Sequence, residues 1–251
     1  MYEIEMHEPS EEFAECWSAA GRHLSRQAGG ELQSWLRSHL TPPFLEHLSF
    51  RLGNQLFFIR VEDEAGRLKA PGNPRGLLSV ADACKGHACV MPMRRRGAEW
   101  VAVSPGWGLV DARNGSIVDP PSLVSADDIE MTEWELQSFA VQVVRDQLVK
   151  EGRQLMSWTD NPEVNPSLWF VGDAGPEWVV IRAARYPENE APRPANFAII
   201  QETFKARGFK GHFASVAFAD SRQADASGDE PMPLYRGYGM YAAYGGLEGE
   251  G

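Results

Sequence analysis

The fold is decided by LSFRLGNQLFFIRVE, residues 48–62. Leu48, Phe50 and Leu52 alternate with Ser49 and Arg51, which is typical of a strand that buries one face. The dipeptide at 53–54, Gly-Asn, is a turn signal, and the mostly apolar run after it predicts a second strand. The stretch therefore predicts a β-hairpin.

The residues after this hairpin add a helix and further strands. A connection rich in Pro and Gly occupies 63–76 and leads to a helix expected at about 77–85, which Gly86 ends. An apolar strand is expected at 87–93. Two shorter strand pieces are expected at 100–103 and 108–111.

The N-terminal residues 1–47 are expected to form a helical extension. Ser10 is suited to cap a helix, and the residues after it form one apolar stripe at helical spacing: Phe13, Trp17, Ala20 and Leu24. A second stripe at 32–40 predicts another helix, which Pro42 and Pro43 stop.

A capped helix is expected to connect the two halves of the chain, within 126–158. Thr132 and Glu135 fit the capping box, in which each side chain satisfies a backbone N–H group of the first helical turn. One face of this helix carries apolar residues that need burial: Leu136, Phe139, Ala140, Val143 and Leu148.

The same order of patterns recurs after this helix. A second hairpin is expected at 167–182, and the tripeptide KGH of residues 85–87 returns at 210–212. The offset between matching positions rises steadily, from 119 residues at the hairpin turns to 131 at the segments GWG and GYG. Small insertions in loops produce such a drift, so we expect an internal duplication with a pseudo-twofold axis. The alternative is coincidence, because any α+β chain shows hairpins and helices at similar spacings.

These patterns predict an α+β protein with two related halves, each an antiparallel sheet with packed helices. The expected parts are a helical extension at 1–47, a first half at 48–125, a connecting helix at 126–158, a second half at 159–245 and a flexible tail at 246–251.

Composition and charge narrow the classes of partner. The 251 residues carry 24 Lys and Arg against 35 Asp and Glu, a formal net charge of −11. Such a field repels phosphate backbones, so the charge disfavours nucleic acid as a partner and suits a basic protein. The one dense basic run, Arg94-Arg95-Arg96 before Gly97, is expected to be a solvated turn.

Other features of the sequence predict a cytoplasmic location. No apolar run approaches the roughly 20 residues needed to cross a bilayer, so we expect no membrane association. The acidic first residues, MYEIEMHEPSEEF, do not resemble a secretory signal. Three cysteines do not suggest a disulfide framework, which favours a reducing compartment.

The stretch CKGHAC, residues 84–89, raises the question of metal or thiol chemistry. Cys84, His87 and Cys89 are ligand types that zinc prefers, but a fourth ligand such as Cys16 or His212 is not placed nearby by the sequence. The repeat replaces the two cysteines with apolar residues, which favours small buried thiols. We therefore expect no metal and no cofactor.

The enzymatic alternative is a hydrolase that is zinc- or thiol-dependent. It would use His87 and His212 with Cys84, Cys89 or Asp82. A reactive cysteine needs a lowered thiol pKa, whereas Cys84 lies near a predicted helix C-terminus and Cys89 lies in an apolar strand. These positions favour a non-enzymatic role.

Four residues at matching places in the halves are candidates for binding. The Lys-Gly pairs are expected to cap helices, with the glycine left-handed, which leaves His87 and His212 unexplained at strand starts. Arg60 and Arg182 interrupt otherwise apolar strands and need a carboxylate, a strand edge, water or an anionic ligand. The structural alternative is that backbone or internal partners satisfy all four.

Two aromatic residues between glycines complete the candidate set. Trp107 in GWG and Tyr238 in GYG could project from tight bends as stacking platforms, or could lie in the core at glycine bulges.

No acid–base or cofactor motif is present: GxGxxG, the Walker P-loop, HExxH and GxSxG do not occur. The sequence therefore favours a non-enzymatic binding protein that holds a protein or small-molecule partner at the seam between its halves. The long proline-rich loops at 63–76 and 185–196 would flank that seam.

Overall fold

The computed structural model describes residues 10–29, 35–37, 47–225 and 231–249. The chain forms two compact units, Met1–Asp127 and Asp128–Gly251, which we call the first and the second unit. Each is α+β and is described here by itself.

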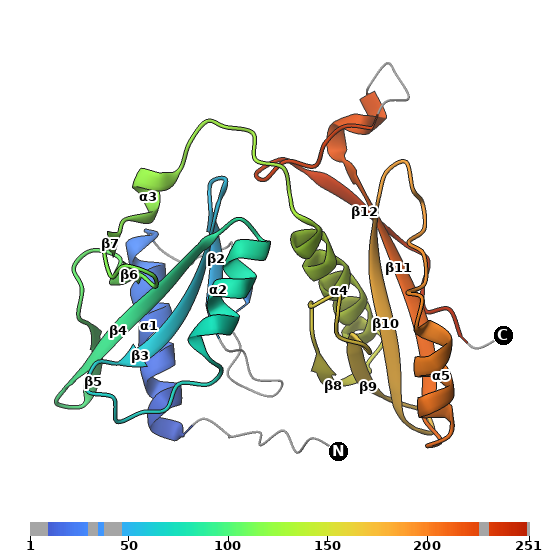
Figure 1. The fold of residues 1–251 in the computed structure, drawn as a ribbon, viewed down its shortest axis with the longest axis horizontal. Helices are drawn as coiled ribbons and strands as arrows, with labels where there is room; N and C mark the ends of the chain where they lie inside the picture. Colours follow the sequence, from blue (N-terminus) through green and yellow to red (C-terminus); the bar gives the residue numbers. More distant parts are fainter. Residues whose placement is uncertain (1–9, 30–34, 38–46, 226–230, 250–251) are drawn as a thin grey trace. The chain divides into compact units, whose positions relative to one another are not determined.

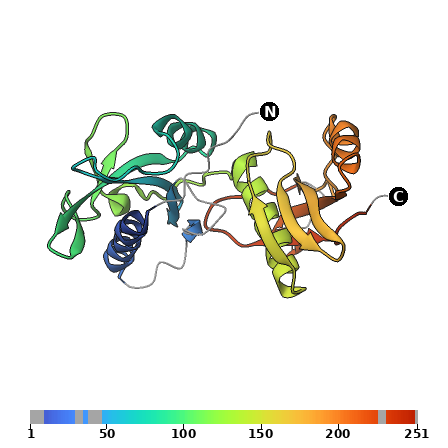
Figure 2. The same ribbon diagram turned by 90° about the horizontal axis from the view of Figure 1, so that it is seen from below.

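The first unit is a mixed sheet with a helix on each face (Figures 1 and 2). Its strand order is β1-β2-β3-β4-β6-β7, with β5 paired to β4. The strands are β1 (Trp35–Arg37), β2 (Leu48–Leu52), β3 (Gln55–Asp63), β4 (His87–Arg96), β5 (Glu99–Ala102), β6 (Leu109–Asp111) and β7 (Ile117–Val118). The helices are α1 (Glu11–Gln27), α2 (Pro74–Ala83) and the short α3 (Pro120–Leu123).

The predicted hairpin is confirmed as β2 and β3, with Leu52 opposite Gln55. Helix α1 is also confirmed: Ser10 accepts a hydrogen bond from the Phe13 N–H, and the predicted apolar stripe is buried. That stripe packs on the β3 and β4 side chains of one core, so α1 is part of the first unit and not an extension of it.

The helix expected at 32–40 is wrong where the structure describes it. Residues 35–37 form β1, which pairs antiparallel with β2, and the rest of the expected helix lies outside the described residues. The backbone hydrogen bonds that β1 gains by pairing with the edge of the sheet cannot be predicted from the spacing of leucines along the chain.

The second unit has the strand order β12-β11-β10-β9-β8. Its elements are α4 (Glu133–Lys150), β8 (Gln154–Trp158), β9 (Leu168–Gly172), β10 (Gly175–Arg185), α5 (Phe197–Lys205), β11 (Lys210–Asp220), the 3₁₀ turn η1 (Ser221–Asp225) and β12 (Met240–Tyr244). Helices α4 and α5 cover opposite faces of this sheet (Figures 1 and 2).

The capping box predicted at Thr132 and Glu135 is confirmed at the start of α4. The apolar face of α4 packs on β10 and β11, so this helix is a core element of the second unit and not a connector. Its burial requirement is met inside one unit.

Both sheets are mixed, so the expectation of antiparallel sheets is wrong. In each unit a helix precedes three antiparallel strands, and a second helix then carries the chain to a strand parallel to the third. The parallel pairs are β3 with β4 and β10 with β11. The crossover helix is the cause, because it returns the chain to the end where the preceding strand began.

The chain after β12 is attached to the sheet, which differs from the flexible tail expected at 246–251. Glu248 and Phe213 exchange two backbone hydrogen bonds, of 2.9 and 3.1 Å. The Glu248 carboxylate also accepts a hydrogen bond from Arg193 at 2.7 Å. Ladder pairing next to β11 therefore holds residues that have little side-chain surface to bury.

None of the helices in the described part of the chain is both long and apolar enough to cross a membrane.

Candidate functional site

The two predicted histidines occupy the same place in their units. His87 begins β4 opposite Phe57 of β3, and His212 lies near the start of β11 opposite Val179 of β10. Both rings face the helix that precedes the sheet, as expected from their spacing to the buried residues two and four places on. His87 stacks on Phe57 with ring centres 5.0 Å apart.

Each imidazole is bound by a side chain of the neighbouring parallel strand. The His87 Nε2 atom lies 3.0 Å from the Gln55 side-chain oxygen, and His212 Nε2 lies 2.6 Å from a Glu177 carboxylate oxygen. Gln55 and Glu177 both stand two residues before the strand partner of their histidine. The correspondence between Gln55 and Glu177 depends on the parallel register of the strands, which the sequence did not predict.

The second unit thus holds a buried carboxylate–imidazole pair. Glu177 is 8% and His212 6% exposed, and the Lys210 ammonium lies 3.8 Å from the same carboxylate. The Glu177 side chain lies over Gly172, where an added Cβ would be 2.1 Å from the carboxylate. His212 Nδ1 is buried and has no hydrogen-bond partner among the described residues. Burial on this scale suits a structural pair that closes the core.

The glycine of KGH has a different role from the one expected. Lys85, with a φ of 48°, takes the left-handed conformation after α2, whereas Gly86 does not. A Cβ at Gly86 would lie 2.8 Å from the Phe58 ring, and one at Gly211 would lie 2.0 Å from the Trp178 ring. The recurring glycine therefore admits an aromatic ring over the strand, on the face covered by α2 or α5.

Arg60 fastens the first proline-rich loop to the sheet. Its guanidinium donates to the carbonyls of Pro71, at 2.7 Å, and Ala70, at 3.3 Å. Its Nε donates to Glu62 at 2.7 Å. These contacts use the donors that the hypothesis of an anionic ligand would need.

Arg182 fastens a different loop, the one between β8 and β9. It donates to the Pro162 carbonyl at 3.0 Å, to the Asn165 side chain at 2.8 Å and to the Ile181 carbonyl at 2.6 Å. Burial lowers the pKa of this guanidinium. These three hydrogen-bond partners are neutral oxygens.

The two predicted aromatic platforms lie in different environments. Trp107 is buried and stacks on Phe50 with ring centres 5.8 Å apart, so its faces belong to the core. Tyr238 is 43% exposed. It donates to Asp128 at 3.0 Å, and the Arg222 guanidinium lies 4.3 Å from its ring centre.

The three cysteines are free and buried. Burial raises the pKa of the Cys89 thiol to about 12, and it raises the pKa of the Cys16 thiol to about 12 as well. The Cys89 thiol donates a weak hydrogen bond to the His87 carbonyl, not to the imidazole. Asp82 is paired with Arg113. In the described part of the chain, no three His, Cys, Asp or Glu side chains are grouped so that they could hold a metal ion.

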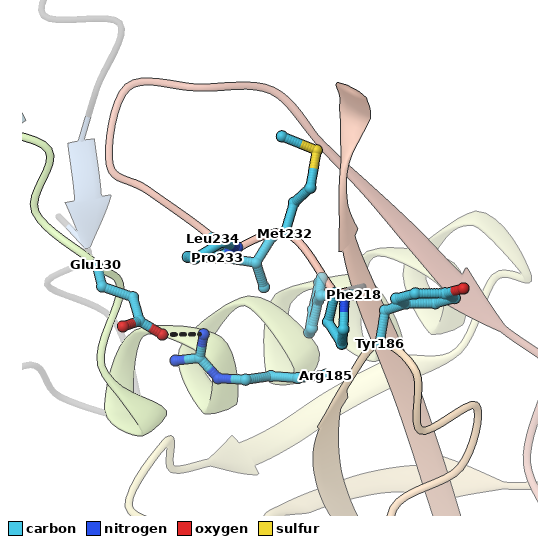
Figure 3. A pocket seen from close by; sticks show the side chains of 8 residues that line it. Glu130, Arg185, Tyr186, Phe218, Met232, Pro233 and Leu234 are labelled. Atoms are coloured by element: carbon cyan, nitrogen blue, oxygen red, sulfur yellow. Dashed lines mark hydrogen bonds and ion pairs between the residues drawn. The ribbon is translucent and has the colours of Figure 1, made fainter. Parts of the chain in front are cut away.

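A pocket of about 190 Å³ lies in the second unit (Figure 3). It is at the far end of β10 and β11 from His212, where Arg185 pairs with Phe218. No sequence pattern pointed to it. Its lining residues are Glu130, Arg185, Tyr186, Phe218, Pro231, Met232, Pro233 and Leu234. Apolar side chains form one wall, and an ion pair forms the other.

The ion-pair wall is built on Arg185, at the end of β10. Its guanidinium donates to Glu130 at 3.1 Å, to Glu133 at 2.8 Å and to the Met131 carbonyl. Glu130 and Glu133 are the more exposed partners, at 55% and 75% of the side chain against 27% for Arg185.

The apolar wall is anchored to the start of α4. The Leu234 carbonyl accepts from the Met131 N–H at 2.8 Å, and the Arg236 N–H donates to the Ile129 carbonyl at 2.9 Å. The Arg236 guanidinium is fully buried and donates twice to Glu135, at 2.8 and 2.9 Å. The capping carboxylate thus also holds the chain at Arg236, two residues after Leu234 of the apolar wall.

Comparison with known families finds one match, which lies within the second unit. Residues 134–249 match a family model described as "Domain of unknown function (DUF8840)", from α4 to the end of the described chain. Comparisons with curated proteins and with solved structures found no match. The second unit is therefore similar to a family that is described as a domain of unknown function.

Proposed function

We propose that the protein is a non-enzymatic binding protein that seats one side chain of a protein partner in the pocket of its second unit. The observation that carries this proposal is the pocket itself. It combines an apolar wall at Phe218, Met232 and Leu234 with a polar wall at Arg185 and Glu130. Such a mixture is typical of sites that fix one group in one orientation.

The size of the pocket favours a protein partner over a small molecule. Sites for cofactors and drug-sized ligands hold roughly 300–1,000 Å³, whereas this pocket holds about 190 Å³. A single apolar side chain that anchors a larger interface fits that volume. Tyr238 of the predicted binding set lies three residues beyond Tyr235, the bridge partner of Glu130, and would extend the same surface.

The chemistry of the thiols makes the hydrolase alternative less favourable. Nucleophilic attack needs a thiolate, and a pKa of about 12 leaves roughly one Cys89 thiol in 10⁵ ionised at pH 7. His87 and His212 each hydrogen-bond a side chain of the neighbouring strand, Gln55 and Glu177. These contacts favour a scaffold role for both histidines.

We also propose that the two units arose by duplication of one ancestral unit. The shared element order and the equivalent Gln55–His87 and Glu177–His212 pairs support this. An experimental structure tests it: β2, β3, α2 and β4 should superpose on β9, β10, α5 and β11 with His87 on His212. A superposition that requires a different strand register would contradict the duplication.

Blocking the pocket tests the binding proposal. We expect Met232→Trp to fill the space between the two walls and to weaken the partner's affinity at least about tenfold, because the anchor loses its seat. Met156→Trp is the matched control, since Met156 is 44% exposed on β8 and does not line the pocket. The partner is first captured with tagged wild-type protein and then titrated, purified, against each variant.

One outcome would contradict the binding proposal. If Met232→Trp binds the purified partner as tightly as the wild type while its thermal unfolding shows the pocket region intact, the pocket is not the seat.

A further inference from the structure

We infer that the side chain seated in this pocket is apolar and is flanked in the partner by lysine or arginine, which Glu130 and Glu133 recognise. This inference rests on the proposed function and specifies the partner's chemistry.

The first observation is the excess of carboxylate around Arg185, where Glu130 lines the pocket and Glu133 pairs with the same guanidinium from outside the lining. One guanidinium, that of Arg185, is shared by two carboxylates. Each carboxylate can accept about four hydrogen bonds and receives one from Arg185, so both retain acceptor capacity. The local charge of this trio is negative.

The second observation is that the two carboxylates are more exposed than the guanidinium that they bind. Glu130 and Glu133 expose 55% and 75% of their side chains, whereas Arg185 exposes 27%. The positive charge is therefore the inner layer of this wall and the negative charge the outer one. A partner at this surface therefore has better access to the carboxylates than to the guanidinium.

The third observation is that negative charge is concentrated in the second unit. Residues 128–251 carry 19 Asp and Glu against 11 Lys and Arg, a net charge of −8 out of −11 for the whole chain. Long-range attraction would bring a basic segment toward this unit and raise its association rate. An acidic segment would be repelled.

The expected preference is modest, because the carboxylates are solvent-exposed. Exposed ion pairs contribute little individually, so two of them should favour a basic over a neutral segment by about threefold to tenfold. At about 1 M salt, where screening acts within about 3 Å, the preference should largely vanish. The apolar contact would persist.

The test uses three acetylated, amidated peptides on the full-length protein: Gly-Leu-Lys-Lys-Gly, Gly-Leu-Ser-Ser-Gly and Gly-Leu-Glu-Glu-Gly. Binding is followed through the ¹³C-labelled methyl group of Met232, with that of Met156 as an internal control outside the pocket. We expect the lysine peptide to bind about threefold to tenfold more tightly than the serine peptide, and the glutamate peptide to bind least.

The variant Glu133→Gln keeps a hydrogen-bond acceptor for Arg185 and removes one charge. It should reduce the preference for the lysine peptide over the serine peptide, whereas Glu163→Gln, at an exposed site outside the pocket, should leave that preference unchanged.

The outcomes separate the two proposals. Equal binding of all three peptides at Met232, or tightest binding of the glutamate peptide, overturns this inference and leaves the pocket as a binding site. Failure of every peptide to shift the Met232 methyl signal, while the purified partner remains bound to Met232→Trp, overturns the proposed function as well.

Discussion

At the scale of single residues, the two histidines occupy corresponding positions but have hydrogen-bond partners of different chemistry. The imidazole is bound by an amide in the first unit, through Gln55, and by a carboxylate in the second, through Glu177. The second pair is also the more buried, because His212 is 6% exposed whereas His87 is only half-buried. The cost of losing the partner should therefore differ between the units.

We expect Glu177→Ala to lower the free energy of opening of β11 by about 1.5–3 kcal/mol, since it removes a buried charged acceptor from His212. Glu177→Gln, which keeps an acceptor, should cost less, and Gln55→Ala should cost less in β4. Hydrogen exchange of the strand amides in the full chain measures each value. Glu163→Ala is the control, and an equal effect of Glu163→Ala and Glu177→Ala would contradict the role of the pair.

The buried thiols predict a specific dependence on pH. Cys16 and Cys89 have a usual pKa of 9.0 and a folded value of about 12, so above pH 9 the unfolded chain loses protons that the folded chain keeps. The sign is destabilising: the thiols have no effect below pH 9, and between pH 9 and 12 each lowers stability by about 1.4 kcal/mol per pH unit.

Guanidinium unfolding at a series of pH values tests this. A Cys16→Ala, Cys89→Ala double variant should lose less stability than the wild type on going from pH 9 to pH 11. Identical pH slopes for the two proteins would show that the thiols ionise normally when folded.

At the scale of elements, the KGH repeat marks the start of the parallel strand in each unit. Its glycine allows the Phe58 ring in the first unit and the Trp178 ring in the second to lie against the strand. The ring then packs under the crossover helix, where Trp178 meets Phe197 and Phe204 of α5. The tripeptide is thus a packing feature of the strand and its crossover helix.

We expect Gly211→Ala to destabilise the second unit by about 3 kcal/mol, because the new methyl group would lie 2.0 Å from the Trp178 ring. Gly86→Ala should cost less, since its nearest contact is 2.8 Å. Gly245→Ala is a matched control, with ordinary φ and nothing within 4 Å of the added carbon. Chemical denaturation gives the three values, and a Gly211→Ala cost no larger than that of Gly245→Ala would contradict this packing.

At the scale of the whole molecule, the chain builds a separate core in each unit. The hydrophobic cluster that contains α1 draws its described residues from the first unit, and the clusters that pack on α4 and α5 draw theirs from the second. Units of this size bury enough surface to fold alone.

We therefore expect the fragments 1–127 and 128–251, expressed separately, each to unfold cooperatively on heating. Circular dichroism of the two fragments and of the full chain checks this. A fragment with helical signal but no cooperative transition would show that its core depends on the other unit.

The sequence by itself determined the local structure: the hairpin at 48–62, the capped helices α1 and α4, and the recurrence of KGH. Each depends on neighbours in the chain, through alternation, helical spacing or side-chain capping. Tertiary structure alone decided the parallel pairing of β3 with β4 and of β10 with β11, and with it the partners of His87 and His212. It also decided the pocket. The pocket's walls include Glu130, Arg185 and Met232, each of which lies about 50 residues from the next along the chain. Such contacts depend on where crossover helices and long loops return the chain, which no local pattern of residues encodes.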